Sequence, residues 1–175
     1  VDNISQCQED YILFVGRLAP DTGIFDYIKA WEVVSKNTDM DFVICGDGFI
    51  KSDIEKYIKE HSIERIVFKG FVSDVENYIK NAKVIFTAGY LGILEAFSYK
   101  KNVIATYDNE LKKDYLKMIP YHENMMWVVD NNIQNIIKVF DEAIEDDTKK
   151  ELAYQYSLEN NWKNVKKDYY KLWTI

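Results

Sequence analysis

Short apolar segments alternate with longer amphipathic segments along most of the chain. The apolar segments are rich in β-branched and aromatic residues, and they lie at 11–16, 41–46, 65–70, 84–87, 102–105 and 125–129. A continuous apolar run of this length is typical of a strand whose two faces are both covered, as in a parallel sheet. The pattern therefore predicts six buried strands.

The segments between these runs carry apolar residues at helical spacing. They lie at 24–34, 50–61, 75–82, 109–118 and 133–144. His61 comes at the end of the second apolar stripe, so we expect it to end a helix rather than to bind a ligand. Ser73 and Glu76 fit the Ser-x-x-Glu pattern of a capping box, which predicts the start of the third helix.

Strands that alternate with helices indicate an α/β domain with a doubly wound, Rossmann-like, parallel six-stranded sheet and helices on both faces. The 175 residues are expected to form a single domain, 1–175. The last segment, at about 148–173, predicts one or two helices that pack on the sheet or on a neighbouring domain. The chain begins with Val1 rather than Met, which fits either processing or a piece of a longer protein.

The composition restricts the class of function. The net charge of −7 argues against general binding of nucleic acid or membrane, which would favour a basic surface. No apolar run reaches the about 18 residues of a membrane span, and no signal peptide is recognisable. Cys7 and Cys45 are the only cysteines, so neither a disulfide framework nor a zinc spacing is expected. We expect no metal, no cofactor and a cytoplasmic location.

Glycines gather where predicted strands end. They are Gly16, Gly46, Gly48, Gly70, Gly89 and Gly92. In an open α/β sheet, ligands bind outside the carboxyl ends of the strands, so this placement predicts a ligand site. Arg17, one of only two arginines, follows the first of these glycines, and a guanidinium is well suited to phosphate.

The stretch from 84 to 105 predicts a strand, a glycine-bearing loop, a helix that contains Glu95, and a second strand. A helix that begins after such a loop directs backbone N–H groups toward an anion. Glu95 can accept hydrogen bonds from sugar hydroxyls, so the unit would suit a nucleoside diphosphate with its ribose. The alternative is purely structural, because a glutamate near a helix start favours the helix dipole and glycines ease turns.

Four segments in order resemble the C-terminal, nucleotide-sugar-binding domain of family 4 retaining glycosyltransferases, which have the two-domain GT-B fold. The resemblance runs from about Ile12 to Asp147. The segments are VGRLAPDTGIFDYIKAW, FVICGDGF, VFKGFVSDVENYIKNAKVIF and LGILEAFSYKKNVIA. The separations of the four segments, rather than any single one, make the resemblance strong.

The resemblance implies roles for individual residues. The donor diphosphate would be bound by the first loop and by backbone amides at the helix start, namely Gly16, Arg17, Thr22, Tyr90, Leu91 and Gly92. The base and ribose would be bound by Gly46, Gly70, Phe71, Val72 and Glu95. Glu95 resembles the second glutamate of the family's Glu-x7-Glu motif.

Two positions depart from the family pattern. Thr87 stands where the family has its first glutamate, so the catalytic group near the sugar is unknown. Thr22 stands in place of a lysine that would pair with the leaving diphosphate, and either Asp21 or Thr22 is a candidate N-cap for the next helix. Lys100 and Lys101 could replace the lost cation, although we expect both to be solvated surface charges.

The resemblance implies a hexosyltransferase of bacterial type that takes a UDP- or GDP-sugar, acts in surface polysaccharide or glycoconjugate synthesis, and works at the inner face of the membrane. An N-terminal acceptor domain of the same full-length protein would be its partner, and this half alone would be inactive. The alternative is a non-catalytic homologue that stabilises a partner transferase. An unrelated α/β enzyme or receiver-like module is disfavoured, because neither an acidic phosphoacceptor cluster nor a G-x-G-x-x-G motif is present.

Overall fold

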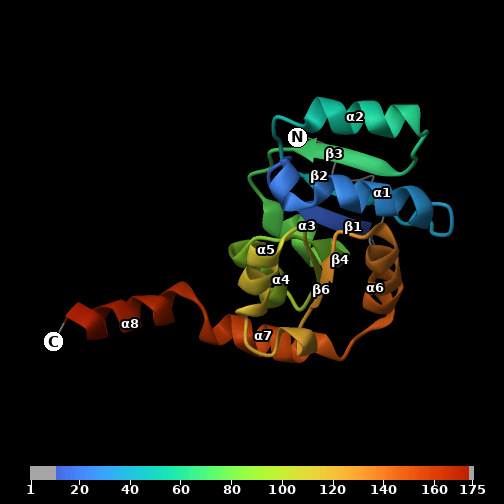
Figure 1. Ribbon diagram of the computed structural model, residues 1–175. Helices are drawn as coiled ribbons and strands as arrows, with labels where there is room; N and C mark the ends of the chain where they lie inside the picture. The colour runs from blue at the N-terminus through green and yellow to red at the C-terminus, as the bar shows by residue number, and fades with distance from the viewer. Residues whose placement is uncertain (1–10, 174–175) are drawn as a thin grey trace.

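The computed structural model describes residues 11–173. Within them, one sheet of parallel strands has the order β3-β2-β1-β4-β5-β6 (Figure 1). The strands are β1 (Tyr11–Val15), β2 (Phe42–Cys45), β3 (Ile66–Gly70), β4 (Ala82–Phe86), β5 (Asn102–Tyr107) and β6 (Trp127–Asp130). All six predicted strands are confirmed, and so is the parallel sheet.

A helix follows every strand. The helices are α1 (Ile24–Val34), α2 (Lys51–Glu60), α3 (Val75–Asn81), α4 (Tyr90–Ser98), α5 (Glu110–Lys117), α6 (Ile133–Glu145), α7 (Lys149–Glu159) and α8 (Trp162–Trp173), with short 3-10 turns η1 (Pro20–Thr22) and η2 (His122–Asn124). His61 occupies the C-cap of α2, as expected from its place at the end of the apolar stripe.

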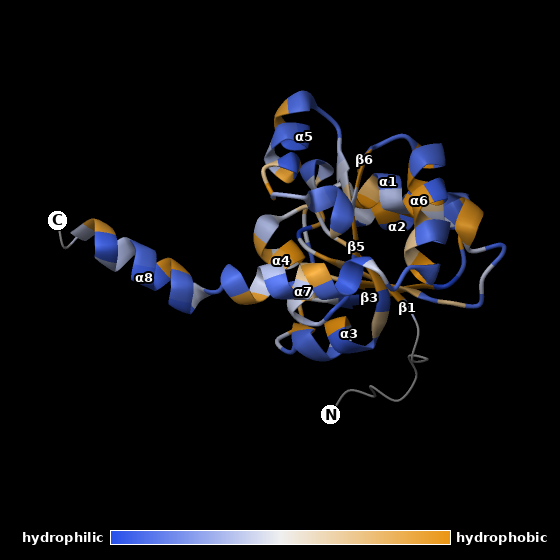
Figure 2. Cartoon of the chain, turned by 90° about the horizontal axis from the view of Figure 1, so that it is seen from below, coloured by the Kyte–Doolittle hydropathy of each residue, from blue (hydrophilic) through white to orange (hydrophobic). Residues whose placement is uncertain are grey.

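The side chains of β1 show how the two faces of the sheet are covered. Ile12 and Phe14 point into one buried cluster, which α1, α2 and α6 complete, while Leu13 points into a second cluster formed with α3, α4, α5 and α7. This alternation follows from the two-residue period of a strand. Orange segments of the helices in Figure 2 face the strands from both sides, which confirms the doubly wound arrangement.

The order of the strands reverses between β1 and β4. The chain leaves β1 for α1 on one face and leaves β4 for α4 on the opposite face. The two loops therefore diverge, and a crevice opens between them at the carboxyl edge of the sheet. This topological switch point determines where a ligand can be bound.

The expectation of a Ser73–Glu76 capping box at the start of α3 is wrong. Asp74, not Ser73, occupies the N-cap of α3, and no side chain caps it. Because the helix begins one residue later than the capping box requires, Glu76 is the second helical residue and cannot reach back to the N-cap. The Asp74 carboxylate instead accepts a hydrogen bond from the Asn77 side chain.

The C-terminal segment divides into two helices with different surroundings. α7 packs against α4 and buries Ala153 and Ser157. α8 buries no residue and extends away from the rest of the chain (Figure 1). The sequence predicts that the segment packs on the sheet or on a neighbouring domain. α7 joins the cluster that covers one face of the sheet, whereas α8 is not covered by this chain, so its packing on a neighbouring domain stays a prediction.

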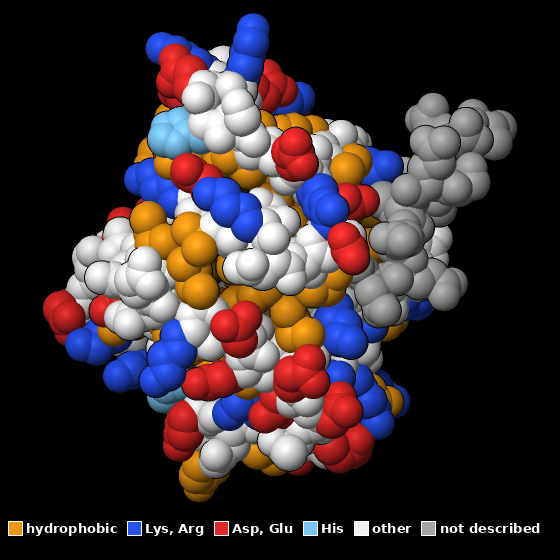
Figure 3. Space-filling view, turned by 90° about the vertical axis from the view of Figure 1, so that its right-hand side faces the viewer, with side chains coloured by type: hydrophobic (Ala, Val, Ile, Leu, Met, Phe, Trp, Pro, Cys, Tyr) orange, Lys and Arg blue, Asp and Glu red, His pale blue; other side chains and the backbone are white. Residues whose placement is uncertain are grey.

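The surface carries mixed charge on the face drawn in Figure 3, where Lys and Arg side chains are scattered among Asp and Glu. Such a face offers no broad basic patch for nucleic acid. None of the helices between residues 11 and 173 is long and apolar enough to cross a membrane. Cys45 is buried as expected, whereas Cys7 lies outside the described residues.

Candidate functional site

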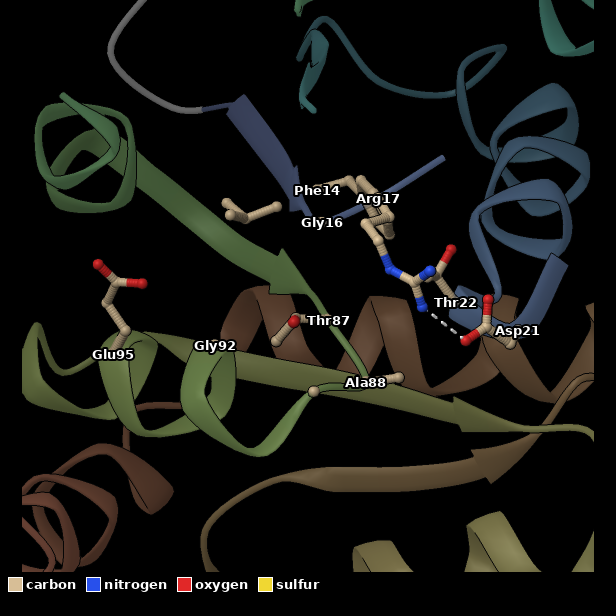
Figure 4. Close-up of a pocket in the computed structure, with 11 residues that line it drawn as sticks. Phe14, Gly16, Arg17, Asp21, Thr22, Thr87, Ala88, Gly92 and Glu95 are labelled. Atoms are coloured by element: carbon tan, nitrogen blue, oxygen red, sulfur yellow. Dashed lines mark hydrogen bonds and ion pairs between the residues drawn. The ribbon is translucent and has the colours of Figure 1, made fainter. Parts of the chain in front are cut away.

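A pocket of about 380 Å³ lies at the switch point, between the loops that follow β1 and β4. It is lined by Phe14, Val15, Gly16, Arg17, Asp21, Thr22, Thr87, Ala88, Gly89, Gly92 and Glu95. Figure 4 shows Arg17, Asp21 and Thr22 on one side, Glu95 on the other, and Thr87 between them. The pocket is thus where the topology predicts a ligand.

The loop after β1 is held in place by the neighbouring loop after β2. A Cβ atom at Gly46 would lie 1.8 Å from the carbonyl oxygen of Gly16, so only glycine allows this approach. The backbone N–H of Gly16 donates to the carbonyl of Cys45 at 3.2 Å, and that of Leu18 donates to the carbonyl of Asp47 at 3.0 Å. These contacts fix the backbone on both sides of Arg17.

Arg17 is paired within its own loop. Its guanidinium donates to the Asp21 carboxylate at 3.0 Å, and both side chains are exposed. The Thr22 hydroxyl donates to the carbonyl of Ala19 at 2.7 Å, and Gly23 is the N-cap of α1. The expectation that Asp21 or Thr22 caps α1 is therefore wrong, because both residues belong to the preceding 3-10 turn, where the Asp21 carboxylate pairs with Arg17 and the Thr22 hydroxyl bonds Ala19.

The start of α4 lies on the opposite side of the pocket. Gly89 is its N-cap, and no side chain caps the helix, so its first N–H groups lack partners within the helix. One of them is already used, since the Tyr90 N–H donates to the Tyr115 hydroxyl of α5 at 2.9 Å. Leu91 is exposed, and Gly92 faces Thr87, whose hydroxyl oxygen would lie 2.7 Å from a Cβ at Gly92.

Glu95 presents a carboxylate from the second turn of α4. Burial, followed by the nearby Glu76 carboxylate, raises its pKa above the ordinary value of 4.5. Among residues 11–173, no side chain is recorded as a hydrogen-bond donor to this carboxylate. A desolvated carboxylate in this state gains from hydroxyl donors, which a sugar would supply.

Thr87 lies at the floor of the pocket, with 3% of its surface exposed. The formal charges of the lining residues are one cation, Arg17, and two carboxylates, Asp21 and Glu95. The pocket walls therefore carry little positive charge of their own.

The structure brings together half of the residues predicted for the site. Those that line the pocket are Gly16, Arg17, Thr22, Thr87, Gly92 and Glu95. Those that do not line it are Gly46, Gly70, Phe71, Val72, Tyr90 and Leu91. Gly46 lies against Gly16 of the pocket lining, and its N–H donates to the carbonyl of Gly70 at 2.8 Å. Phe71 is 90% exposed.

Other lining residues escaped the sequence analysis. Phe14 and Val15 belong to the end of β1, and Ala88 to the loop after β4, where their apolar character suggested only core packing. Lys100 is a surface charge, as expected, because it pairs with Glu151 at 2.7 Å beyond the far end of α4. Among the described residues no group of three or more His, Cys, Asp or Glu could hold a metal ion.

A parallel doubly wound sheet with a pocket at its switch point defines a Rossmann-like α/β domain, a class in which ligands bind outside the carboxyl ends of the strands. The chain belongs to the family described as "Glycosyl transferases group 1", which it matches over residues 3–164. Its sheet is one Rossmann-like half of the GT-B arrangement found in these transferases.

Curated relatives agree with this family. The chain is 26% identical over 187 aligned residues to an uncharacterized glycosyltransferase of Methanocaldococcus jannaschii, covering 97% of this chain and 46% of that protein. It is 32% identical over 104 residues to a poly(ribitol-phosphate) alpha-N-acetylglucosaminyltransferase of Staphylococcus aureus, covering 55% and 21%. The chain spans less than half the length of the curated relatives it matches.

Solved structures share the fold. Sucrose-phosphate synthase from Thermosynechococcus elongatus superposes with a TM-score of 0.77 at 17% identity, covering 95% of this chain and 45% of that one. A Staphylococcus aureus TarM mutant in complex with fondaparinux, alpha-GlcNAc-glycerol and UDP superposes with a TM-score of 0.76 at 21% identity, covering 96% of this chain and 36% of that one. The C-terminal domain of a group 1 glycosyl transferase from Francisella tularensis superposes with a TM-score of 0.72 at 23% identity, covering 86% of this chain and 85% of that one.

Proposed function

We propose that this domain binds a nucleoside-diphosphate sugar in the pocket between β1 and β4 and presents it for transfer to an acceptor. The observation that carries the proposal is the lining of one pocket by Arg17, by the start of α4 and by Glu95. Arg17 and the helix N-terminus suit the diphosphate, and the Glu95 carboxylate suits the ribose hydroxyls. The base would lie along the sheet edge near Gly46, Gly70, Phe71 and Val72.

The transfer itself would require a longer protein. An acceptor domain that precedes this one would close over the pocket, position the acceptor and exclude water. The 175 residues alone would then bind a donor without transferring its sugar. This division is supported by the length of the curated relatives, of which this chain spans less than half.

The sugar, the acceptor and the stereochemistry are further parts of the proposal. UDP is present in the TarM complex with which this fold superposes, which makes UDP-sugars the first donors to test and GDP-sugars the second. A glycan or glycoconjugate of a surface polysaccharide is the proposed acceptor, supported by the matched poly(ribitol-phosphate) transferase. Transfer with retention of configuration, at the inner face of the membrane, follows the family that the sequence resembles.

A non-catalytic role is the second candidate, and two features of the pocket favour it. Thr87 supplies no carboxylate at the floor of the pocket, and the Asp21 carboxylate already forms an ion pair with the guanidinium of Arg17. Such a homologue would bind a nucleotide or a partner transferase without turnover. Transfer by the full-length protein separates the two candidates.

Titration calorimetry of UDP, GDP and ADP against this domain tests the proposal directly. Binding of at least one diphosphate, weakened in an Arg17→Ala variant, is the expected result. The matched control is Arg65→Ala, because Arg65 pairs with Asp39 and with the carbonyl of Thr38, outside the pocket. No binding of any of the three by the parent protein would overturn the proposal.

A further inference from the structure

The pocket has too few cations for a diphosphate. Arg17 is its only cationic lining residue, and Asp21 and Glu95 oppose it. A nucleoside diphosphate would add more negative charge, so a stable complex needs another cation or several well-placed hydrogen-bond donors. Lys100 cannot supply it, because it pairs with Glu151 at the other end of α4.

Helix α5 brings a second ammonium to the wall of the pocket. The Lys112 side chain donates to the backbone carbonyl of Asp21, at the peptide that joins Asp21 to Thr22. Both of these residues line the pocket. This is the one hydrogen bond recorded for the Lys112 ammonium in the described chain, so two of its three N–H donors remain for a ligand.

The surroundings of Lys112 also favour an anion. The side chain is half-buried, and burial lowers the pKa of the Lys112 ammonium, whereas nearby carboxylates oppose that shift. In the described chain none of these carboxylates accepts a hydrogen bond from the ammonium. Those carboxylates belong to Asp108, Asp21 and Asp26. A partly desolvated ammonium with unused donors is stabilised by an oxygen-rich anion.

The same helix reaches the other wall of the pocket. Tyr115 lies three positions after Lys112, on the same side of α5. Its hydroxyl oxygen accepts the Tyr90 N–H at 2.9 Å, one residue beyond Gly89, which lines the pocket. Because the oxygen accepts this bond, the hydroxyl proton is free to be donated to a ligand oxygen. The hydroxyl also brings a polar group next to the unsatisfied N–H groups that begin α4.

We infer that Lys112 and Tyr115 of α5 form the phosphate subsite of the pocket, Lys112 as a second cation in addition to Arg17 and Tyr115 as a hydrogen-bond donor beside the start of α4. The inference rests on the proposed function and assigns its diphosphate to particular side chains. Both residues contact the bound ligand directly, and neither takes a proton from it. Two loops that diverge at the switch point are thereby bridged by one helix.

The test compares Lys112→Gln and Tyr115→Phe with two matched controls. Lys113→Gln changes the neighbouring lysine, which pairs with Glu110 at 3.0 Å, and Tyr121→Phe removes an exposed hydroxyl. Calorimetry with UDP, uridine and inorganic pyrophosphate follows binding, and thermal unfolding follows stability. If UDP does not bind, GDP with guanosine or ADP with adenosine replaces it.

Lys112→Gln should weaken the diphosphate and pyrophosphate about tenfold or more while the nucleoside binds as before. The variant should also show a weaker salt dependence, and Lys112→Arg should restore most of the affinity. Tyr115→Phe should weaken the same two ligands about threefold to tenfold, the usual effect of one neutral hydrogen bond. Both controls should bind like the parent.

Parent-like binding of the diphosphate by Lys112→Gln and Tyr115→Phe would overturn this inference and leave the proposed function intact. Equal weakening of diphosphate and nucleoside, with a lower unfolding temperature, would also overturn it, since it would mean that α5 only ties the two loops together. Failure of the parent to bind any of the three diphosphates would overturn both proposals at once.

Discussion

The guanidinium of Arg17 lies 3.0 Å from the carboxylate of Asp21, four positions later in the same loop, and both side chains line the pocket at the switch point. An exposed ion pair of this kind contributes only about 0–1 kcal/mol. A phosphate can therefore displace Asp21 from Arg17 at small cost. The pair holds the guanidinium at the pocket.

Replacing Arg17 should lower the affinity for a diphosphate, and replacing Asp21 should raise it. Arg17→Ala should weaken UDP or GDP by about 1.5–3 kcal/mol, the scale of a hydrogen bond to a charged group. Asp21→Asn should strengthen it by less than about 1 kcal/mol, because a competing carboxylate is lost. Calorimetry at two salt concentrations measures both, and weaker binding by Asp21→Asn would show that Asp21 positions the guanidinium rather than competing for it.

Glu95→Gln should separate ligand binding from stability. The pKa of Glu95 is raised in the fold, so the folded state favours the protonated carboxyl, and this contribution is lost as pH rises through that raised pKa. At pH 7 the glutamine variant should therefore be more stable, by less than about 1 kcal/mol since the carboxyl is still partly solvated. Below pH 4.5 the advantage should vanish. Thermal unfolding from pH 4 to 8 measures this difference.

The same variant should bind ribose-bearing ligands more weakly while pyrophosphate is nearly unaffected, because the carboxylate is proposed to accept the ribose hydroxyls. Ribose binding by the parent should likewise weaken as pH falls through the raised pKa of Glu95. A matched control is Glu76→Gln, which relieves the same repulsion from outside the pocket lining. If both variants bind UDP like the parent, Glu95 does not contact the nucleotide.

Removing α8 should leave the domain folded. The helix buries no residue, and Trp162 and Trp173 are 74% and 73% exposed. Deleting residues 162–175 should change the free energy of unfolding by less than about 0.5 kcal/mol, the usual range for surface changes. Since clustered exposed aromatics favour association, the shorter chain should also be less prone to self-associate. Denaturant unfolding and sedimentation measure the two effects, and a loss above about 2 kcal/mol would contradict the structure.

The two departures from the family pattern are best tested together in the full-length protein. Thr22→Lys adds a cation to the pocket and should raise donor affinity or turnover by a few fold. Thr87→Glu places a carboxylate at a floor position that is 3% exposed, so it should lower stability by about 1–3 kcal/mol and reduce any existing turnover. Donor hydrolysis and transfer are measured for the parent, both single variants and the double variant. Absence of activity in all four, across several sugar donors, would favour the non-catalytic homologue.

The fold was predictable because its signals are local. Each strand is a short apolar run, and the glycines at or soon after the ends of β1, β2, β3 and β4 mark the edge where these parallel strands terminate together. Gly16 lies in the loop after β1 and Gly89 in the loop after β4, and these two loops flank the switch point. Arg17 and Glu95 must therefore approach the same crevice. The prediction of both residues in one pocket needed no knowledge of side-chain contacts.

The partners of these residues needed the tertiary structure. Lys112 and Asp21 are 91 positions apart in the chain, and Tyr115 and Tyr90 are 25 apart, so no periodic pattern links them. The N-cap of α1 is Gly23 rather than Asp21 or Thr22, and that of α3 is Asp74 rather than Ser73. The Thr22 hydroxyl instead donates to the carbonyl of Ala19 in the preceding turn. Hydrophobic periodicity determined the sheet and the edge at which the pocket lies. The packing of α5 across two diverging loops decided which polar groups meet there, since that depends on distances between elements rather than on spacing along the chain.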